Sequence, residues 1–306
     1  VIYDTKFDPL VLFIGGKQGV WYDPSDLSTL FQDVAGTVPV TTDHKPVAKM
    51  LDKSGNNNHA TPPTAASRPL YKTEPSRLLL DKVDDRIVIN FPKRIVGSMT
   101  IATTTGTATY GVDIPQGNLT LGRAYFPSNN IVGLVINEGE LSENDKSKLV
   151  NLFVGKGAIE SFESNTSLAN AFMSWGFLTS FPLIDTSSGT NFQAAWYGNK
   201  LTSFPLINTS SGVSFSLAWY GNSTLTNFPK NAFDNIKGGD FTNAFYNTNL
   251  NQESIDGILV SLVTSGIATG SRVFYQSGGS APSAIGNAAI NTLRSRGWTV
   301  TVTGGY

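Results

Sequence analysis

The sequence contains no cysteine, so neither disulfides nor thiolate metal sites can form. Histidine is also scarce, and His44 and His59 leave little for a histidine metal site or a proton relay. The formal net charge of -1 gives no basic field to attract nucleic acid or an anionic membrane surface. No apolar run approaches the ~18 residues of a membrane-spanning helix. These absences argue against nucleic-acid binding, a thiolate or histidine metal centre and membrane insertion.

The two halves of the chain differ in charge. Residues 158–306 hold six Lys or Arg and seven Asp or Glu, against 16 and 16 in residues 1–157. Ser, Thr, Asn, Gly and aromatic residues make up the difference, and the aromatics recur at regular spacing. Such a polar, weakly charged surface suits uncharged partners such as sugars or other protein shells. The shift predicts two domains, 1–156 and 157–306.

The second half of the chain repeats itself. Residues 178–199 return as residues 201–222, and 17 of the 22 aligned positions are identical. A third copy starts at Leu225 and carries Phe-Tyr at 245–246 where the first two carry Trp-Tyr. Self-similarity at a period of ~20–29 residues is typical of stacked repeat proteins, in which neighbouring units bury each other's apolar faces.

Each copy combines two hydrophobic periods. Phe181 and Leu183 would share one face of a strand by alternation. A helical face at i, i+3, i+4 and i+7 follows, made of Phe192, Ala195, Trp196 and Asn199. The pattern therefore predicts strand, turn, short helix and turn in each copy. It also predicts one right-handed stack over residues 158–303, with Phe181, Phe204 and Phe228 in register.

Elsewhere the sequence predicts mostly short strands. Leu10–Ile14 is a candidate buried strand, and Ser25 or Asp26 could cap a brief helical turn. Turn-bounded strands, typical of an antiparallel sandwich, are expected at 77–80, 86–91, 98–103, 107–112, 119–123 and 131–137. Helices are expected after the caps Ser142, Asn251 and Ser283, and a closing strand at 298–302.

Two runs in the first half carry a family resemblance. Residues 19–33, Gly-Val-Trp-Tyr-Asp-Pro-Ser-Asp-Leu-Ser-Thr-Leu-Phe-Gln-Asp, and residues 51–60, Leu-Asp-Lys-Ser-Gly-Asn-Asn-Asn-His-Ala, resemble bacteriophage tail and virion proteins with a concanavalin A-like (LamG-type) domain. Val-Asp-Asp at 83–85 resembles that family's Gly-Val-Asp-Asp turn, with Lys82 in place of the glycine. Residues 132–134 and the helix after Ser142 resemble its closing strand and helix. The resemblance implies a jelly-roll β-sandwich over 1–156, shortened between 86 and 130, that serves as an attachment module.

The repeats resemble the BspA-like leucine-rich repeats of phage fibres and bacterial surface proteins. Asn199 and Asn222 stand where that class often has cysteine or asparagine. The resemblance implies a leucine-rich-repeat solenoid with a C-terminal cap over 157–306. The expected fold class is therefore α+β and multidomain, a β-sandwich followed by a solenoid.

No catalytic residue, metal site or cofactor is predicted. The Glu-x-Asp-x-Glu spacing that would place two carboxylates for glycoside hydrolysis is absent. Four carboxylates cluster at 138–145, where helix capping and a solvated helix face are the favoured interpretation. Asp84 and Asp85 could ligate Ca²⁺, but a turn is the favoured role for them.

Two surfaces of the repeats are candidate binding sites. Tyr197, Tyr220 and Tyr246 each follow a ring expected in the core, so they should lie on the surface and could stack on sugar rings or dock a partner. On the strand segments, alternate residues should point outward on a concave face. The candidates there are Ser180, Ile184, Ser203 and Ile207, with Pro182 and Pro205 between them.

The resemblance implies a non-enzymatic virion protein, made in the host cytoplasm, at the tail or capsid surface. A tail-fibre or baseplate adhesin would bind a host-surface glycan or protein through its repeats. The expected partners are other virion proteins, the host receptor and further copies in a homo-oligomer, without nucleic acid or membrane insertion. A head-decoration or capsid fibre protein is the structural alternative. A polysaccharide depolymerase is the enzymatic one, disfavoured by the missing carboxylate pattern.

Overall fold

The computed structural model describes residues 7–81, 83–122, 130–158 and 167–305. Lys82, which replaces the glycine of the resembling turn, lies outside the described residues. The chain forms two compact units, Val1–Glu163 and Ser164–Tyr306. Composition had suggested a boundary after residue 156.

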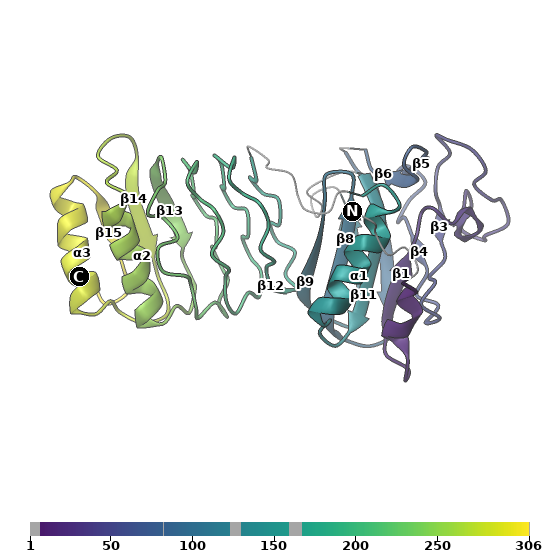
Figure 1. Ribbon diagram of the computed structural model, residues 1–306, viewed down its shortest axis with the longest axis horizontal. Helices are drawn as coiled ribbons and strands as arrows, with labels where there is room; N and C mark the ends of the chain where they lie inside the picture. The colour runs from purple at the N-terminus through teal and green to yellow at the C-terminus, as the bar shows by residue number, and fades with distance from the viewer. Residues whose placement is uncertain (1–6, 82, 123–129, 159–166, 306) are drawn as a thin grey trace. The chain divides into compact units, whose positions relative to one another are not determined.

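The first unit contains two antiparallel sheets (Figure 1). One sheet has the order β9-β8-β11-β6-β5, and β1 pairs with the second half of β11. Its strands are β1 Gly19–Tyr22, β5 Leu70–Lys72, β6 Arg77–Leu79, β8 Ile95–Thr103, β9 Gly106–Ile114 and β11 Asn130–Glu138. The other sheet has the order β10-β7-β4-β3-β2. Its strands are β2 Leu30–Phe31, β3 Lys49–Met50, β4 Ala60–Thr61, β7 Arg86–Phe91 and β10 Gly117–Gly122.

The burial patterns show how these sheets are covered. Strand β7 alternates, with Ile87, Ile89 and Phe91 buried, as a strand with one solvated face does. Strand β11 is buried at every position from Ile131 to Asn137, because both of its faces are covered. Helix α1 (Glu143–Val154) packs on one face of β11, where the Phe153 ring lies over Gly133. A Cβ at residue 133 would stand 2.0 Å from that ring, so glycine is required there.

Most of the elements predicted for this unit are confirmed. Strands β6 to β11 lie on the six predicted segments, of which Arg123 lies outside the described residues. Helix α1 begins after Ser142, whose side chain accepts a hydrogen bond from the Asp145 N–H. Asp26 caps the short 3₁₀ helix η2 (Leu27–Thr29) as predicted. The strand expected at Leu10–Ile14 is wrong. Residues Pro9–Phe13 form the 3₁₀ helix η1, because Asp8 caps the Leu10 N–H and Pro9 favours a helical first turn.

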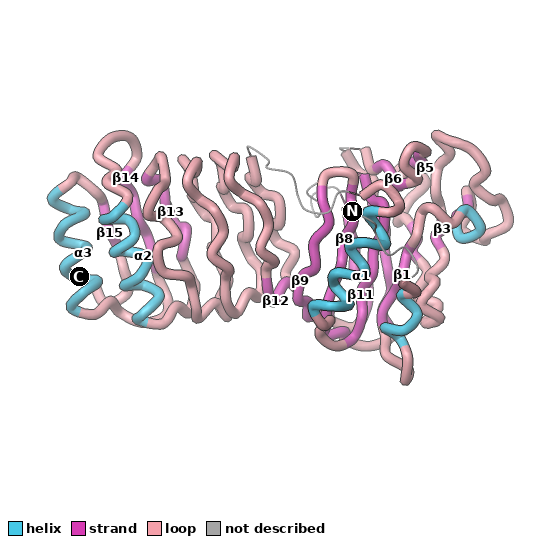
Figure 2. Tube along the Cα trace, viewed as in Figure 1, coloured by secondary structure: helices cyan, strands magenta, loops and turns pink. Residues whose placement is uncertain are grey.

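The second unit ends in helices and a parallel sheet (Figure 2). Strands β13 (Gly239–Phe245), β14 (Arg272–Gln276) and β15 (Thr299–Thr301) pair in that order. Helices α2 (Gln252–Thr264) and α3 (Ala284–Ser295) begin after Asn251 and Ser283, the predicted caps. Each cap side chain accepts a backbone N–H of the first turn, at 2.9 Å for Asn251 and 3.1 Å for Ser283.

The predicted leucine-rich-repeat solenoid is wrong, and with it the α+β class. Among the described residues strand predominates over helix, 29% against 16%, and the helix expected in each copy is absent. Residues 192–199 and 215–222 form turns, and β12 is a strand over Leu178–Ser180 alone. The reason lies in the backbone, since Ala194 and Leu217 have φ of 50° and 59°, which a right-handed helix cannot contain.

Consecutive copies nonetheless pair with each other through their backbones (Figure 1). Parallel bridges join Ser167, Asn191, Ser214 and Asp240 in succession. The Trp196 N–H donates to the Ala218 carbonyl at 2.9 Å, and the Trp219 N–H donates to the Ala244 carbonyl at 3.0 Å. A helix would have bonded these amides to residues four positions earlier in the same segment. The copies are therefore stacked ribbons of turns.

Candidate functional site

Each ribbon holds two left-handed residues at fixed positions. The first position is taken by Asn170, Ala194, Leu217 and Asn243, with φ of 59°, 50°, 59° and 52°. The second, four residues later, is taken by Ser174, Gly198, Gly221 and Asn247, with φ of 57°, 68°, 74° and 55°. Glycine and asparagine tolerate this conformation better than other residues. Because the two positions recur in four segments, each segment follows the same path and its side chains face the same way.

Buried rings and buried amides hold the ribbons in register. Trp196, Trp219 and Phe245 are fully buried, as predicted, and stack at 5.2 and 4.9 Å between ring centroids. The Asn222 amide donates to the carbonyls of Trp196 (2.8 Å) and Trp219 (3.0 Å), which belong to different copies. Asn199 makes the same pair of bonds one copy earlier, to Phe172 and Trp196. These amides fix the spacing between neighbouring ribbons.

One residue after each buried ring stands a tyrosine. Tyr197, Tyr220 and Tyr246, joined by Tyr275 of β14, form a continuous stack that we call the tyrosine row. Successive ring centroids lie 4.8, 5.0 and 5.6 Å apart, with interplanar angles of 5°, 13° and 21°. Tyr246 is exposed (36%) and the other three side chains are half-buried. The structure thus brings together the three tyrosines singled out in the sequence.

Tyr275 was missed in the sequence. Its ring stacks on Tyr246, although its segment lies beyond the recognisable copies. One signal was present, since Phe274-Tyr275 repeats the Phe245-Tyr246 pair. The chain passes through helix α2 between the two pairs, which changes the spacing and hides the relation.

The strand-segment candidates do not form one outward face. Ser180 and Ser203 are exposed as expected, but Ile184 and Ile207 are buried, with 8% and 5% exposure. Leu183, expected inside, is 73% exposed. The alternation fails because β12 ends at Ser180, so the inward positions after it are spaced three apart rather than two. Ile184 and Ile207 are therefore core residues.

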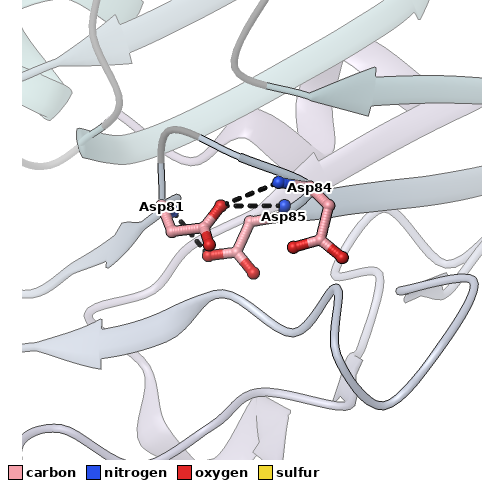
Figure 3. Close-up of side chains that lie close together, drawn as sticks. All are labelled: Asp81, Asp84 and Asp85. Carbon is pink, nitrogen blue, oxygen red and sulfur yellow. Dashed lines mark hydrogen bonds between the residues drawn. The ribbon is translucent and has the colours of Figure 1, made fainter.

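The acidic turn at 81–85 is the candidate metal site (Figure 3). Asp81, Asp84 and Asp85 offer carboxylate oxygens within 4.8 Å of one another. One Asp81 oxygen accepts the N–H groups of Val83, Asp84 and Asp85 at 2.8, 3.0 and 3.1 Å, and Asp85 accepts the Asp81 N–H. Burial raises the pKa of the Asp85 carboxyl, and the charges of Asp81 and Asp84 add to the rise. The contacts match the turn interpretation.

The Asn-rich run at 51–60 has a structural role in the first unit. Asp52 is buried and accepts the N–H groups of Trp21 (3.0 Å), Ser54 (2.8 Å) and Asn58 (3.1 Å). The His59 Nδ1 accepts the Asp52 N–H at 3.1 Å. These contacts tie the loop to strand β1, so Asp52 holds the loop in place.

Three of the four clustered carboxylates at 138–145 are engaged by neighbouring groups. Glu138 pairs with Lys93 (3.2 Å) and Glu143 with Lys146 (2.6 Å), while Asp145 accepts the Ser142 hydroxyl (2.8 Å). The Gln18 backbone N–H, then the Lys93 side chain, lower the pKa of the Glu138 carboxyl. Capping and surface pairing therefore account for Glu138, Glu143 and Asp145, as expected from the sequence, while Glu140 is exposed.

Among the described residues, no helix combines the length and apolar character needed to cross a bilayer. The tyrosine row is the candidate surface whose members the structure brings together, at a nearly constant spacing. No family model matches this sequence, and no curated protein and no solved structure matches it.

Proposed function

We propose that the protein is a non-enzymatic binding protein of a bacteriophage virion, of the tail-fibre or baseplate type. The tyrosine row is proposed as the surface that contacts a glycan or protein of the host cell. The observation that carries this proposal is the row itself, four partly exposed tyrosines at nearly constant spacing. Tyrosine is enriched at binding surfaces because its two-torsion side chain gives contact area at little entropic cost.

The virion setting is supported by the runs at 19–33 and 51–60, which resemble phage tail and virion proteins. The first unit would then attach the chain to other virion proteins. Its surface carries ion pairs such as Arg94–Asp113 (2.6 Å) and Lys93–Glu138 (3.2 Å), which are suited to specific docking. The second unit, with few charges and a repeated surface, would face the host.

A non-enzymatic role is supported by the state of the carboxylates. Glycoside hydrolysis needs two carboxyl groups facing a shared substrate position. Asp81, Asp84 and Asp85 close a turn, and Glu138, Glu143 and Asp145 are paired or cap α1. No two of these six carboxyl groups are arranged as the acid and the nucleophile of a glycosidase.

The proposal is tested by binding of the labelled full-length chain to a panel of intact bacterial strains. The double variant Tyr197→Ala and Tyr220→Ala should lose tenfold or more in affinity, because truncated contact residues at binding hot spots typically cost ~1 kcal/mol or more each. The matched control is Leu183→Ala with Leu206→Ala, which removes exposed side chains from the same copies. Equal binding by the two double variants would contradict the proposed site.

A further inference from the structure

The rings of the tyrosine row cover one another's faces. Tyr220 lies between Tyr197 and Tyr246, and Tyr246 lies between Tyr220 and Tyr275, all nearly parallel. A sugar that stacks on an aromatic residue needs a free ring face. The two inner rings have none to offer, so what they present to a partner is the ring edge and the phenolic hydroxyl. Stacking on sugar rings, one of the two contacts expected from the sequence, stays a prediction, and the stacked faces favour contact through the ring edge and the hydroxyl.

The four hydroxyls are available for hydrogen bonds. Within the described residues, no hydrogen bond joins the hydroxyl of Tyr197, Tyr220, Tyr246 or Tyr275 to another protein group. Each hydroxyl can donate one hydrogen bond and accept others. The row therefore presents hydroxyls attached to rings that repeat at 4.8, 5.0 and 5.6 Å.

The surroundings of the row are polar and nearly uncharged. Gln193, Ser216 and Thr242 stand four residues before Tyr197, Tyr220 and Tyr246, and all three are exposed or half-buried. The segments 191–197, 214–220 and 240–246 contain no Lys or Arg. Their single charge, Asp240, accepts the Thr242 hydroxyl at 2.7 Å. These three segments therefore offer a polyanion no cation. The segment of Tyr275 contains Arg272, whose guanidinium donates to the carbonyls of Ala268 and Arg296.

From these observations we infer that the tyrosine row binds an extended, uncharged polysaccharide through its hydroxyl edge, with the polysaccharide running along the row. A glycan carries hydroxyls at every sugar unit, and each can donate and accept, so it complements both the phenols and the flanking amide and hydroxyl groups. A protein partner would instead need apolar area at its contact centre. The inference rests on the proposed function, since it assigns a ligand class to the same surface.

Because the proposed contact is made by the hydroxyls, a variant that removes them and keeps the rings tests it. Tyr→Phe at positions 197, 220, 246 and 275 removes the hydroxyls and keeps the ring stack, so the fold and its thermal unfolding should not change. The matched Tyr→Ala variant removes both. The control is Tyr71→Phe, which lies in the first unit and is buried.

Binding is measured by affinity electrophoresis of the full-length chain in gels with neutral polysaccharides (dextran, mannan, linear β-glucan, galactan) or acidic ones (polygalacturonate, hyaluronan). At least one neutral polymer should retard the wild type, and the fourfold Phe variant should lose tenfold or more in affinity. Affinity for linear oligosaccharides of the retarding polymer should rise with each added sugar until the row is spanned, then level off.

Five results would overturn the inference. Retardation by none of the neutral polymers, or stronger retardation by the acidic ones, excludes the neutral glycan. If the fourfold Phe variant binds fully and the Ala variant does not, the ring edges and not the hydroxyls contact the ligand. The tyrosine row then stays the proposed binding site. If neither the Phe variant nor the Ala variant changes binding to cells, the tyrosine row is not the binding site, and the proposed function fails together with the inference. This result therefore differs from the preceding one, in which only the inference fails. Cell binding that is lost after protease treatment of the cells would assign a protein receptor instead.

Discussion

The two units bury their interiors in different ways. In the first, strands that are far apart in the sequence pair with each other, as where Gly19 to Tyr22 pair with Leu134 to Asn137. In the second, rings meet the same ring of the next copy, as in the stack of Phe181, Phe204 and Phe228 at 5.5 and 5.4 Å. A core of the first kind depends on many different contacts. A core of the second kind depends on one contact made repeatedly.

The buried polar groups differ in the same way. The first unit encloses charges: Asp23 is 2% exposed and pairs with Lys156 (2.9 Å) and Lys53 (3.6 Å). The second unit encloses neutral amides, Asn199 and Asn222. A buried amide keeps its hydrogen bonds at any ordinary pH, whereas a buried carboxylate can be protonated. Lowering the pH should therefore destabilise the first unit more than the second.

The largest effect is expected from Trp219→Ala. Trp219 stacks on Trp196 and Phe245, so truncation should cost ~3–5 kcal/mol of unfolding free energy. Because the same contact links successive copies, hydrogen exchange should accelerate in the copies on both sides. Phe153→Ala, in the first unit, should accelerate exchange around β11 and α1.

Trp219→Phe is the control for that prediction. The indole N–H of Trp219 is buried without a hydrogen-bond partner among the described residues, and Phe245 fills the same position one copy later. The variant should cost ~1–2 kcal/mol, since it keeps a stacked ring and removes an unsatisfied donor. Faster exchange in 201–222 alone after Trp219→Ala would show that the copies are not coupled.

A smaller loss is expected from Asn222→Ala. The variant removes the side-chain amide that donates to the Trp219 carbonyl, and it removes one of the two side-chain amides that donate to the Trp196 carbonyl. The unfolding free energy, measured by chemical denaturation, should fall by ~2–3 kcal/mol. Asn222→Thr should cost less, because Thr248 holds the equivalent place and donates to the Phe245 carbonyl at 2.9 Å. An equal loss in both variants would argue against the amide as the link.

Asp23→Asn should destabilise the first unit by ~2 kcal/mol at neutral pH, because Lys156 loses its carboxylate partner. Lys53 loses only its longer contact (3.6 Å) and keeps the pair with Asp26 at 2.6 Å. Burial alone would raise the pKa of the Asp23 carboxyl, but hydrogen bonds from Ser25 and Lys156 and the lysine charges lower it below its usual value. A lowered pKa stabilises the fold above the unfolded-state value of ~3.9, and that contribution is lost as the pH falls through the folded-state pKa. The difference between wild type and variant should thus shrink below about pH 4. A difference that is constant with pH would contradict the pairing.

The smallest effect is expected from Leu206→Ser. Leu206 is 55% exposed, so the change should stay within ~0.5 kcal/mol, while Ile207→Ser should cost ~2–4 kcal/mol because Ile207 is buried. The alternation in the sequence predicts the opposite ranking. Thermal unfolding of the two variants therefore decides between the sequence pattern and the structure.

The first unit was largely predictable because its signals are local. The strands from Arg77 to Glu138 are short, β-rich and bounded by turns, and Ser142 caps α1 in the usual way. In the second unit the inward positions were right for Trp196 and Asn199, but the inferred helix was wrong. Two left-handed residues bring those side chains to one side with the same spacing that a helix would give, and side-chain periodicity cannot distinguish the two backbones.

The candidate site was predictable in part for the same reason. Tyr197, Tyr220 and Tyr246 could be predicted as surface residues because each directly follows, in the sequence, a ring expected in the core. The way their faces cover one another depends on how closely the ribbons approach, which no sequence pattern shows. The stacking of Tyr275 on Tyr246 depends on the path of the chain around α2, so the repeated Phe-Tyr pair in the sequence was not enough to place it in the row.

The near identity of residues 178–199 and 201–222 has a genetic consequence. Recombination between two such similar gene segments can insert or delete one whole copy in frame. Each inserted copy would bring its own left-handed residues, its own bridging asparagine and its own phenol, and the C-terminal helices would still close the end. We expect a chain with residues 200–222 duplicated to fold and to need a longer oligosaccharide to reach its limiting affinity. The number of repeat copies in the gene would then set the length of glycan that the protein binds.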